Sequence, residues 1–435
     1  MIFGRIGLNR RIAGKTDGKI VETPQHRAAN IICRERVEYR IIMINLVLFG
    51  VRTVGTRTTG GETKLLQHQR LARFRFIHLQ ESGEIAGFIV KVNAIKIEIV
   101  VQFGKIFSAR PINPADGLQL IPIQGFNYYP RLHPWHTFNQ GEWDPVTTER
   151  ELKLGASLGA NVVRLFVDYN FSIDLKTPQP TPTFFAPVQW YIDNVRQCVD
   201  LCGRLGLKVI LTLFDSLDWA IYQPQNRWIA EEYLKLIVPP FVNDPRILCW
   251  DLQNEPDRAI AQVGANIVIP FFQRLSLLTR ALDRNQLQTI GWIDRARGKY
   301  FSELDNYLDF YCIHFYDKAS NLADLLQMYK TKTRKPLMLQ EFGLATGGPG
   351  SDGANTEQDQ VNHYDTILNT LVADNLCGSV LWCLNDFPIG LAGNPPIQTD
   401  SPENHFGVFR LDYSEKPVTT LLRNRWLNQL QMTNH

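Results

Sequence analysis

The sequence predicts an α/β fold, a closed (β/α)8 (TIM) barrel, with an additional N-terminal segment that is β-rich or poorly ordered. From about residue 119 onward, short apolar runs rich in Val, Ile and aromatic residues alternate with longer amphipathic stretches. This alternation is typical of βα units repeated around a parallel sheet. Eight such units in roughly 310 residues fit a closed barrel better than an open doubly wound sheet.

The eight predicted strands are Leu120–Tyr128, Asn161–Val167, Lys208–Phe214, Ile247–Gln253, Gln288–Trp292, Phe310–His314, Leu337–Glu341 and Ser379–Leu384. Helical periodicity separates most of them, for example over Val188–Leu205, where apolar residues recur every three or four positions. The connection Ile293–Asp309 has the weakest helical pattern. A barrel carries its functional side chains at the carboxyl ends of its strands, so the chemistry is expected at these ends.

The first 110 residues differ from the rest. They hold 19 Lys and Arg against 8 Asp and Glu, whereas residues 111–435 hold 27 against 35 and contain all nine Trp. We therefore expect two parts, a basic N-terminal segment (1–110) and the barrel domain (111–435). β-Branched runs in the first part favour a small β-rich domain. A poorly ordered segment, or one upstream of the native translation start, remains an equal alternative.

Composition excludes several classes of protein. With 44% hydrophobic and 20% charged residues and a mean hydropathy of −0.17, the chain is globular rather than disordered or fibrous. The apolar run 41–51 is shorter than the ~20 residues that cross a bilayer, so no membrane span is expected. Residues 1–14 lack the apolar core of a secretory signal peptide, and the localisation stays open. Seven Cys without a CxxC pair indicate buried free thiols and no thiolate metal site.

Two strands end in a carboxylate. The fourth predicted strand ends in Asn254-Glu255-Pro256, and the seventh ends in Glu341, followed closely by Gly343. An ionised carboxylate at the end of a buried strand is costly unless it is hydrogen-bonded or its pKa is shifted. Hydrolysis of a glycosidic bond needs two such groups, one to protonate the leaving oxygen and one to attack or to activate water. Two matching strand ends indicate this chemistry more strongly than a lone Asn-Glu-Pro.

With these motifs, residues 119–430 resemble retaining (β/α)8 glycoside hydrolases of the clan that contains cellulases and β-mannanases. They are most similar to glycoside hydrolase family 5. The resemblance implies that Glu255 is the general acid/base and that Glu341 is the nucleophile that forms the glycosyl-enzyme. The implied activity is double-displacement cleavage of β-glycosidic bonds in a mannan- or glucan-type polysaccharide or oligosaccharide.

The resemblance also assigns substrate-binding residues. Arg164, in the second strand, matches the family arginine that hydrogen-bonds the nucleophile, and a buried guanidinium there would keep Glu341 ionised. Asn254 would donate to the sugar 2-hydroxyl group.

Aromatic and imidazole side chains complete the expected cleft. His314 and Tyr316, at the sixth strand, match the family pair near the substrate. Trp382, on the eighth strand, would be the stacking platform under the sugar at the cleavage site, because pyranose C–H faces pack on aromatic rings. Tyr128, with its neighbour Tyr129, is expected to line the same cleft.

One position departs from the family pattern. Many members have a His at the end of the third strand, where this sequence has Phe214 and Asp215. The β-mannanase branch, whose third strand ends in an Asn-Trp-Asp type of loop, is more similar, and Asp218-Trp219 fits such a loop. Trp219 is therefore a further candidate for substrate binding, and a mannan-type substrate is favoured over cellulose.

Other motifs do not carry a second function. The stretch 348–353 matches GxGxxG formally, but Pro349 removes an amide that a phosphate would need, so no nucleotide is expected. No cofactor or metal is implied, since two carboxylates suffice. Nucleic acid is not an expected partner. The alternative to an enzyme is a catalytically weak carbohydrate-binding barrel whose basic N-terminal segment binds an anionic partner.

Overall fold

A computed structural model describes residues 123–167, 189–215, 217, 219–293 and 297–432, together with six short strands between residues 15 and 101. The backbone divides into two units, Met1–Phe103 and Gly104–His435. The strands of the first unit form three antiparallel pairs, β1 (Lys15–Thr16) with β2 (Lys19–Ile20), β3 (Ala28–Arg34) with β4 (Ile41–Val47), and β5 (Phe88–Lys91) with β6 (Glu98–Val101). The predicted domain boundary at residue 110 lies outside the described residues and stays a prediction.

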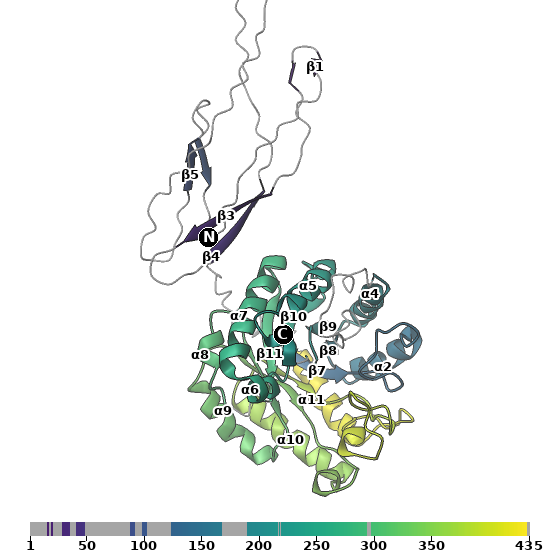
Figure 1. The fold of residues 1–435 in the computed structure, drawn as a ribbon. Helices are drawn as coiled ribbons and strands as arrows, with labels where there is room; N and C mark the ends of the chain where they lie inside the picture. Colours follow the sequence, from purple (N-terminus) through teal and green to yellow (C-terminus); the bar gives the residue numbers. More distant parts are fainter. Residues whose placement is uncertain are drawn as a thin grey trace, which may run out of the picture. The chain divides into compact units, whose positions relative to one another are not determined.

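The second unit is a closed barrel of eight parallel strands (Figure 1). Its strands are β7 (Ile123–Tyr128), β8 (Val162–Phe166), β9 (Lys208–Thr212), β10 (Ile247–Asn254), β11 (Leu287–Trp292), β12 (Tyr311–Phe315), β13 (Leu337–Phe342) and β14 (Gly378–Leu381). Each strand pairs with the next in the chain, and β14 pairs with β7 to close the ring. The predicted (β/α)8 fold is confirmed. The first three residues predicted for the first strand, 120–122, lie outside the described part.

Helices surround the barrel (Figure 1). The α-helices are α2 (Pro145–Ser157), α4 (Gln189–Arg204), α5 (Trp228–Ile237), α6 (Asp257–Val263), α7 (Ala265–Leu282), α8 (Phe301–Leu304), α9 (Leu322–Lys330), α10 (Glu357–Ala373) and α11 (Val418–Met432). The short 3-10 helices are η2 (Trp219–Tyr222), η3 (Pro239–Phe241), η4 (Ala319–Asn321), η5 (Ser351–Gly353) and η6 (Pro402–His405). The connection with the weakest helical pattern contains only the single turn α8.

Local sequence signals explain where several helices begin. The side chain of Asp144 accepts hydrogen bonds from the backbone N–H groups of Val146 (3.0 Å) and Thr147 (3.1 Å), and Pro145 occupies the first position of α2. Both features favour helix initiation at this point. Thr356 and Asp359 form a reciprocal capping box at the start of α10.

The core of the barrel unit has three parts. One apolar cluster fills the space between the strands and the helices. A second cluster, drawn largely from the first residues of the strands, closes the amino end of the barrel interior and includes Ile123, Val162, Ile210, Phe310 and Met338. A third, aromatic cluster lies at the carboxyl ends. The middle of the interior holds buried polar side chains, which include Asn127, Arg164, Asp251 and Gln340. This polar layer positions the site.

Six cysteines, all those with described side chains, are free and buried, as predicted, whereas Cys33 has no described side chain. Among the described helices, none combines the length and the apolar composition needed to cross a bilayer.

Candidate active site

A cleft of about 430 Å³ opens at the carboxyl ends of the strands. It brings together six of the nine residues predicted from the sequence, namely Trp219, Asn254, Glu255, Tyr316, Glu341 and Trp382. Its walls are completed by Gln253 of β10, Arg258 of α6 and residues from four connections, Trp135, Asp215, Leu217, Ile293, Gly393, Asn394, Ile397, Glu403 and Phe406. The strand-end pattern therefore located the cleft.

Arg164 lies beneath the cleft in the polar layer and is fully buried. Its guanidinium donates to Asp251 Oδ2 from Nη2 (2.7 Å) and Nε (3.0 Å), and it donates from Nη1 to Glu341 Oε1. It also donates to three neutral side chains, those of Asn127 (3.1 Å), Thr212 (2.9 Å) and Asn254 (3.0 Å). Burial alone would lower the pKa of Arg164, but the adjacent carboxylates of Asp251 and Glu341 outweigh burial and raise it. The guanidinium group therefore stays charged.

Glu341 is held from both oxygens. Arg164 contacts Oε1, and the hydroxyl group of Tyr316 donates to Oε2 at 2.7 Å. Burial raises the pKa of Tyr316 well above its ordinary value, and the adjacent charge of Glu341 raises it further, so this hydroxyl stays a hydrogen-bond donor. Both contacts hold the carboxylate in one orientation at the floor of the cleft.

Glu255 follows β10 in a left-handed backbone conformation (φ +44°), which is uncommon for a residue with a side chain. A hydrogen bond from its N–H to Gly291 O (2.8 Å) holds this conformation. Its carboxylate contacts His314 Nδ1 (3.2 Å, Oε1) and Arg258 Nη2 (2.6 Å, Oε2). Burial opposes ionisation, but His314 and then Arg258 outweigh it, so the pKa of Glu255 is lowered.

His314 connects the two carboxylates. Its Nδ1 lies 3.2 Å from Glu255 Oε1 and 3.4 Å from Glu341 Oε2, while Nε2 lies 3.0 Å from Gln340 Oε1. Since Gln340 donates its amide N–H to Asp251 (3.1 Å), its oxygen faces the imidazole and Nε2 carries the proton. Burial opposes a charged imidazole, but Glu341 and Glu255 outweigh it and raise the pKa of His314. When the imidazole is charged, its Nδ1 proton therefore lies within reach of Glu255.

Gly291, on β11, makes this close arrangement possible. A Cβ atom there would lie 2.3 Å from Gln340 Oε1, 2.7 Å from His314 Nε2 and 3.0 Å from Arg164 Nη2. Its N–H donates to Asp251 Oδ1 at 3.1 Å, and its carbonyl accepts from Glu255. No larger residue could stand at this point without displacing the polar layer.

An aromatic wall borders the carboxylates. Trp382 is 7% exposed and makes edge contacts with Tyr129, Trp135 and Phe166, at ring-centroid distances of 6.1–6.4 Å. Trp219 is 43% exposed and stacks on Tyr222 with centroids 6.5 Å apart. Both indoles line the cleft. The neighbouring candidate Asp218 lies outside the described residues.

Tyr128 does not lie in the cleft, contrary to the sequence expectation. Its ring packs in the layer between strands and helices, and its hydroxyl donates to Glu151 Oε2 on α2 at 2.8 Å. Alternation along β7 explains this, because Asn127 points into the barrel and Tyr128 points outward. The next residue, Tyr129, reaches the site and donates to Asp215 Oδ2 at 2.6 Å.

Sequence reasoning missed several polar residues around the site. Asp251, Gln340 and Asn127 complete the layer around Arg164. Asp215 accepts from Asn254 Nδ2 at 3.0 Å, and burial, the largest influence, raises the pKa of Asp215 to about 6. The available signal was a polar residue within an apolar strand, as in Trp250-Asp251-Leu252.

Glu255, His314 and Glu341 could in principle hold a cation, since one donor atom from each lies within 4.8 Å of the others. Two guanidinium groups already contact the remaining carboxylate oxygens, Arg258 at Glu255 and Arg164 at Glu341. A metal ion would face these positive charges, whereas a proton fits between His314 and the carboxylates. We therefore interpret the group as a proton-sharing set.

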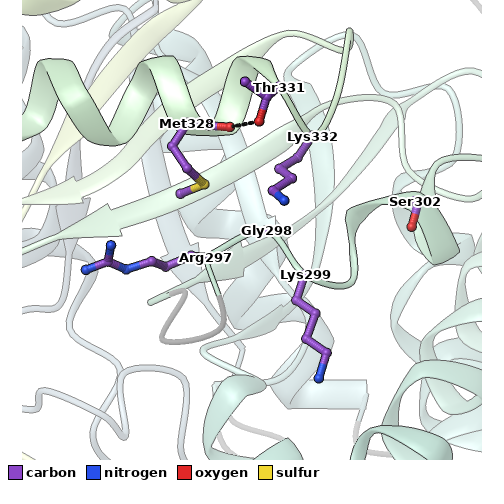
Figure 2. A pocket seen from close by; sticks show the side chains of 7 residues that line it. All are labelled: Arg297, Gly298, Lys299, Ser302, Met328, Thr331 and Lys332. Carbon is purple, nitrogen blue, oxygen red and sulfur yellow. Dashed lines mark hydrogen bonds between the residues drawn. The ribbon is translucent and has the colours of Figure 1, made fainter.

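A separate hollow of about 630 Å³ lies between the segment that follows β11 and the end of α9. It contains Arg297, Lys299 and Lys332, but Figure 2 shows the Arg297 and Lys299 side chains extending in different directions. The three cations do not converge on one point, so this hollow does not form a second candidate site.

The barrel and its carboxylate-lined cleft define a glycoside hydrolase. The family model described as cellulase (glycosyl hydrolase family 5) matches residues 123–388, more than half of the chain. The chain therefore belongs to glycosyl hydrolase family 5, and the resemblance inferred from the motifs is confirmed.

Individual relatives are distant. Mannan endo-1,4-beta-mannosidase 1 of Arabidopsis thaliana is 21% identical over 345 residues, which cover 62% of this chain and 80% of the relative. A GH5_18 protein from Streptomyces cattleya, solved in complex with Manβ1-4GlcNAc, has a TM-score of 0.56 at 16% identity, covering 71% of this chain and 80% of that one. A family 5 mannosidase from Rhizomucor miehei has a TM-score of 0.53 at 15% identity, covering 72% and 94%. The two structures support the barrel fold.

Proposed function

We propose that this chain is a retaining β-mannoside hydrolase in which Glu341 is the nucleophile and Glu255 the general acid/base. The observation that carries the mechanism is the separation of the two carboxylates, one oxygen of Glu255 lying within 4.8 Å of one oxygen of Glu341. Retaining enzymes hold these groups about 5–5.5 Å apart, whereas inverting enzymes need roughly 6.5–9.5 Å to admit a water molecule.

In the first step, Glu341 attacks the anomeric carbon and Glu255 gives its proton to the glycosidic oxygen, so the C–O bond to the leaving sugar breaks and a glycosyl ester forms. In the second step, Glu255 takes a proton from water, whose oxygen attacks the same carbon and releases Glu341. Two inversions at one carbon retain the β configuration.

Protonation of Glu255 needs a source, because its pKa is lowered in the free protein. His314 Nδ1, at 3.2 Å, holds a proton that can pass to Glu255. A sugar that covers Glu255 also excludes water, and desolvation favours the neutral carboxylic acid. Substrate binding therefore moves the shared proton toward the position where the leaving oxygen needs it.

A mannose-type substrate is supported by the relatives' names, a mannan endo-1,4-beta-mannosidase and a mannosidase, and by the neighbour that holds Manβ1-4GlcNAc. Trp382 and Trp219 supply flat apolar faces for pyranose rings in the cleft. Asn254 accepts from Arg164 with Oδ1 and donates to Asp215 with Nδ2, and the second N–H of its amide would contact a sugar hydroxyl group.

The test is reducing-sugar release from β-mannan, glucomannan, carboxymethylcellulose and xylan by the wild type, Glu341→Gln and Glu255→Gln. We expect release from a mannose-containing polymer and a loss of at least about a thousandfold in either variant. Glu232→Gln, on the exposed face of α5, is the matched control and should retain full activity. Proton NMR of the first product should show the β anomer. An α anomer, or full activity of Glu341→Gln, would contradict the mechanism.

A further inference from the structure

Glu403 is a fourth carboxylate at the cleft, and neither the motifs nor the mechanism above gives it a role. It belongs to η6, in the long connection between β14 and α11, and lies in the same cleft as Glu341 and Trp382. Burial, followed by the charge of Glu341, raises the pKa of Glu403 to about 8. At neutral pH this group is therefore largely the neutral acid, and a buried carboxyl group still needs hydrogen-bond partners.

One of the two oxygens of Glu403 has such a partner. The indole N–H of Trp382 donates to Glu403 Oε1 at 3.2 Å. Among the described residues, no hydrogen bond or ion pair reaches Oε2. The carboxyl group thus adjoins the N–H edge of the indole on which a sugar would stack, and one oxygen is left for a further hydrogen bond. A sugar hydroxyl group both donates and accepts, so it can pair with this oxygen in either protonation state.

The connection that carries Glu403 is fixed at several points. The side-chain amide of Asn404 donates to the carbonyl groups of Phe387 and Pro388, both at 3.1 Å. The buried ammonium of Lys416 donates to Asp386 Oδ1 (2.8 Å) and to the carbonyl of His405 (3.1 Å). These contacts on both sides of Glu403 hold its carboxylate in place before a ligand binds, as a specificity contact requires.

We propose that Glu403 is a specificity-determining residue, whose Oε2 hydrogen-bonds a ring hydroxyl group of the sugar stacked on Trp382. This inference rests on the proposed function and extends it. It assigns selection of the sugar at the cleavage position to the β14–α11 connection, in addition to the strand ends. A sugar that lacks the contacted hydroxyl leaves the carboxylate unpaired and is rejected.

The experiment measures binding, so that it does not depend on turnover. Glu341→Gln serves as the background, and isothermal titration compares it with Glu341→Gln/Glu403→Gln. The probes are β-1,4-mannobiose, cellobiose and mannobiose analogues deoxygenated singly at the 2, 3, 4 or 6 position of the non-reducing sugar. Glu341→Gln/Glu232→Gln is the matched control, and thermal melts establish that each variant folds.

In the Glu341→Gln background, one deoxy analogue should bind about tenfold or more weakly than mannobiose, as expected when a buried carboxyl group is left without its hydrogen-bond partner. The added Glu403→Gln change should weaken mannobiose by a similar factor and abolish discrimination against that analogue. Glu403→Asp, which withdraws the carboxylate by one methylene, should also weaken mannobiose. If mannobiose binds equally well with and without Glu403→Gln, or every deoxy penalty survives, the proposal is wrong while the glycosidase function stands. If neither disaccharide binds and the wild type releases no sugar, the proposed function and this inference fail together.

Discussion

Replacing Arg164 by Lys tests how strongly the polar layer depends on one guanidinium. Arg164 donates six hydrogen bonds, two of them to Asp251 and one to Glu341. A Lys ammonium donates three at most, so at least three of these six buried hydrogen bonds are lost. At about 1 kcal/mol for each net hydrogen bond, Arg164→Lys should cost about 3 kcal/mol of the free energy of unfolding.

Thermal unfolding followed by circular dichroism checks this value. For the barrel unit, Gly104–His435, an unfolding entropy of about 2.1 cal/mol/K per residue makes 1 kcal/mol correspond to about 1.5 °C in Tm, so the barrel transition should fall by roughly 4–5 °C. Arg425→Lys is the control, because Arg425 pairs with Asp365 at the surface, where each side chain is about 40% exposed, and the expected cost stays below about 1 kcal/mol. A Tm for Arg164→Lys no lower than that of the control would refute the argument.

Three further predictions concern the cleft. Because the pKa of Glu403 is raised to about 8, the wild type should lose stability relative to Glu403→Gln as the pH rises from about 5 to about 9; equal Tm differences at both pH values would argue against a buried carboxyl group. Arg258→Gln removes a cation 2.6 Å from Glu255. Because this cation lowers the pKa of Glu255, its loss should raise that pKa and move the alkaline limb of kcat/KM to higher pH; an unmoved limb would show that Arg258 does not set the pKa of Glu255. Trp219→Ala should raise KM with little effect on kcat or Tm, since its indole is 43% exposed; a lowered Tm with an unchanged KM would assign Trp219 to packing.

The sequence was sufficient to predict the features that depend only on the order of elements along the chain. Apolar runs and helical periods predicted eight strands and the closed barrel, because each unit alternates locally and pairs with its neighbour in the chain. The strand-end motifs at Glu255 and Glu341 predicted the cleft for the same reason. In a barrel, the carboxyl ends of all strands meet at one rim whatever the details of packing.

Features that depend on side-chain direction or long connections were not predictable in this way. Tyr128 and Tyr129 are adjacent and chemically alike, and only the strand's alternation decides which one reaches the cleft. Asp251 and Gln340 are single polar residues in apolar strands, and the sequence does not show that they share Arg164 and His314.

Gly291 shows how a residue without a side chain can limit the chemistry of this site. One added methyl group would press at once on the amide of Gln340, the imidazole of His314 and the guanidinium of Arg164. The polar layer therefore limits the volume of a substituted side chain as strictly as its charge. A search for functional positions based only on reactive side chains would overlook the residue whose replacement displaces most of them together.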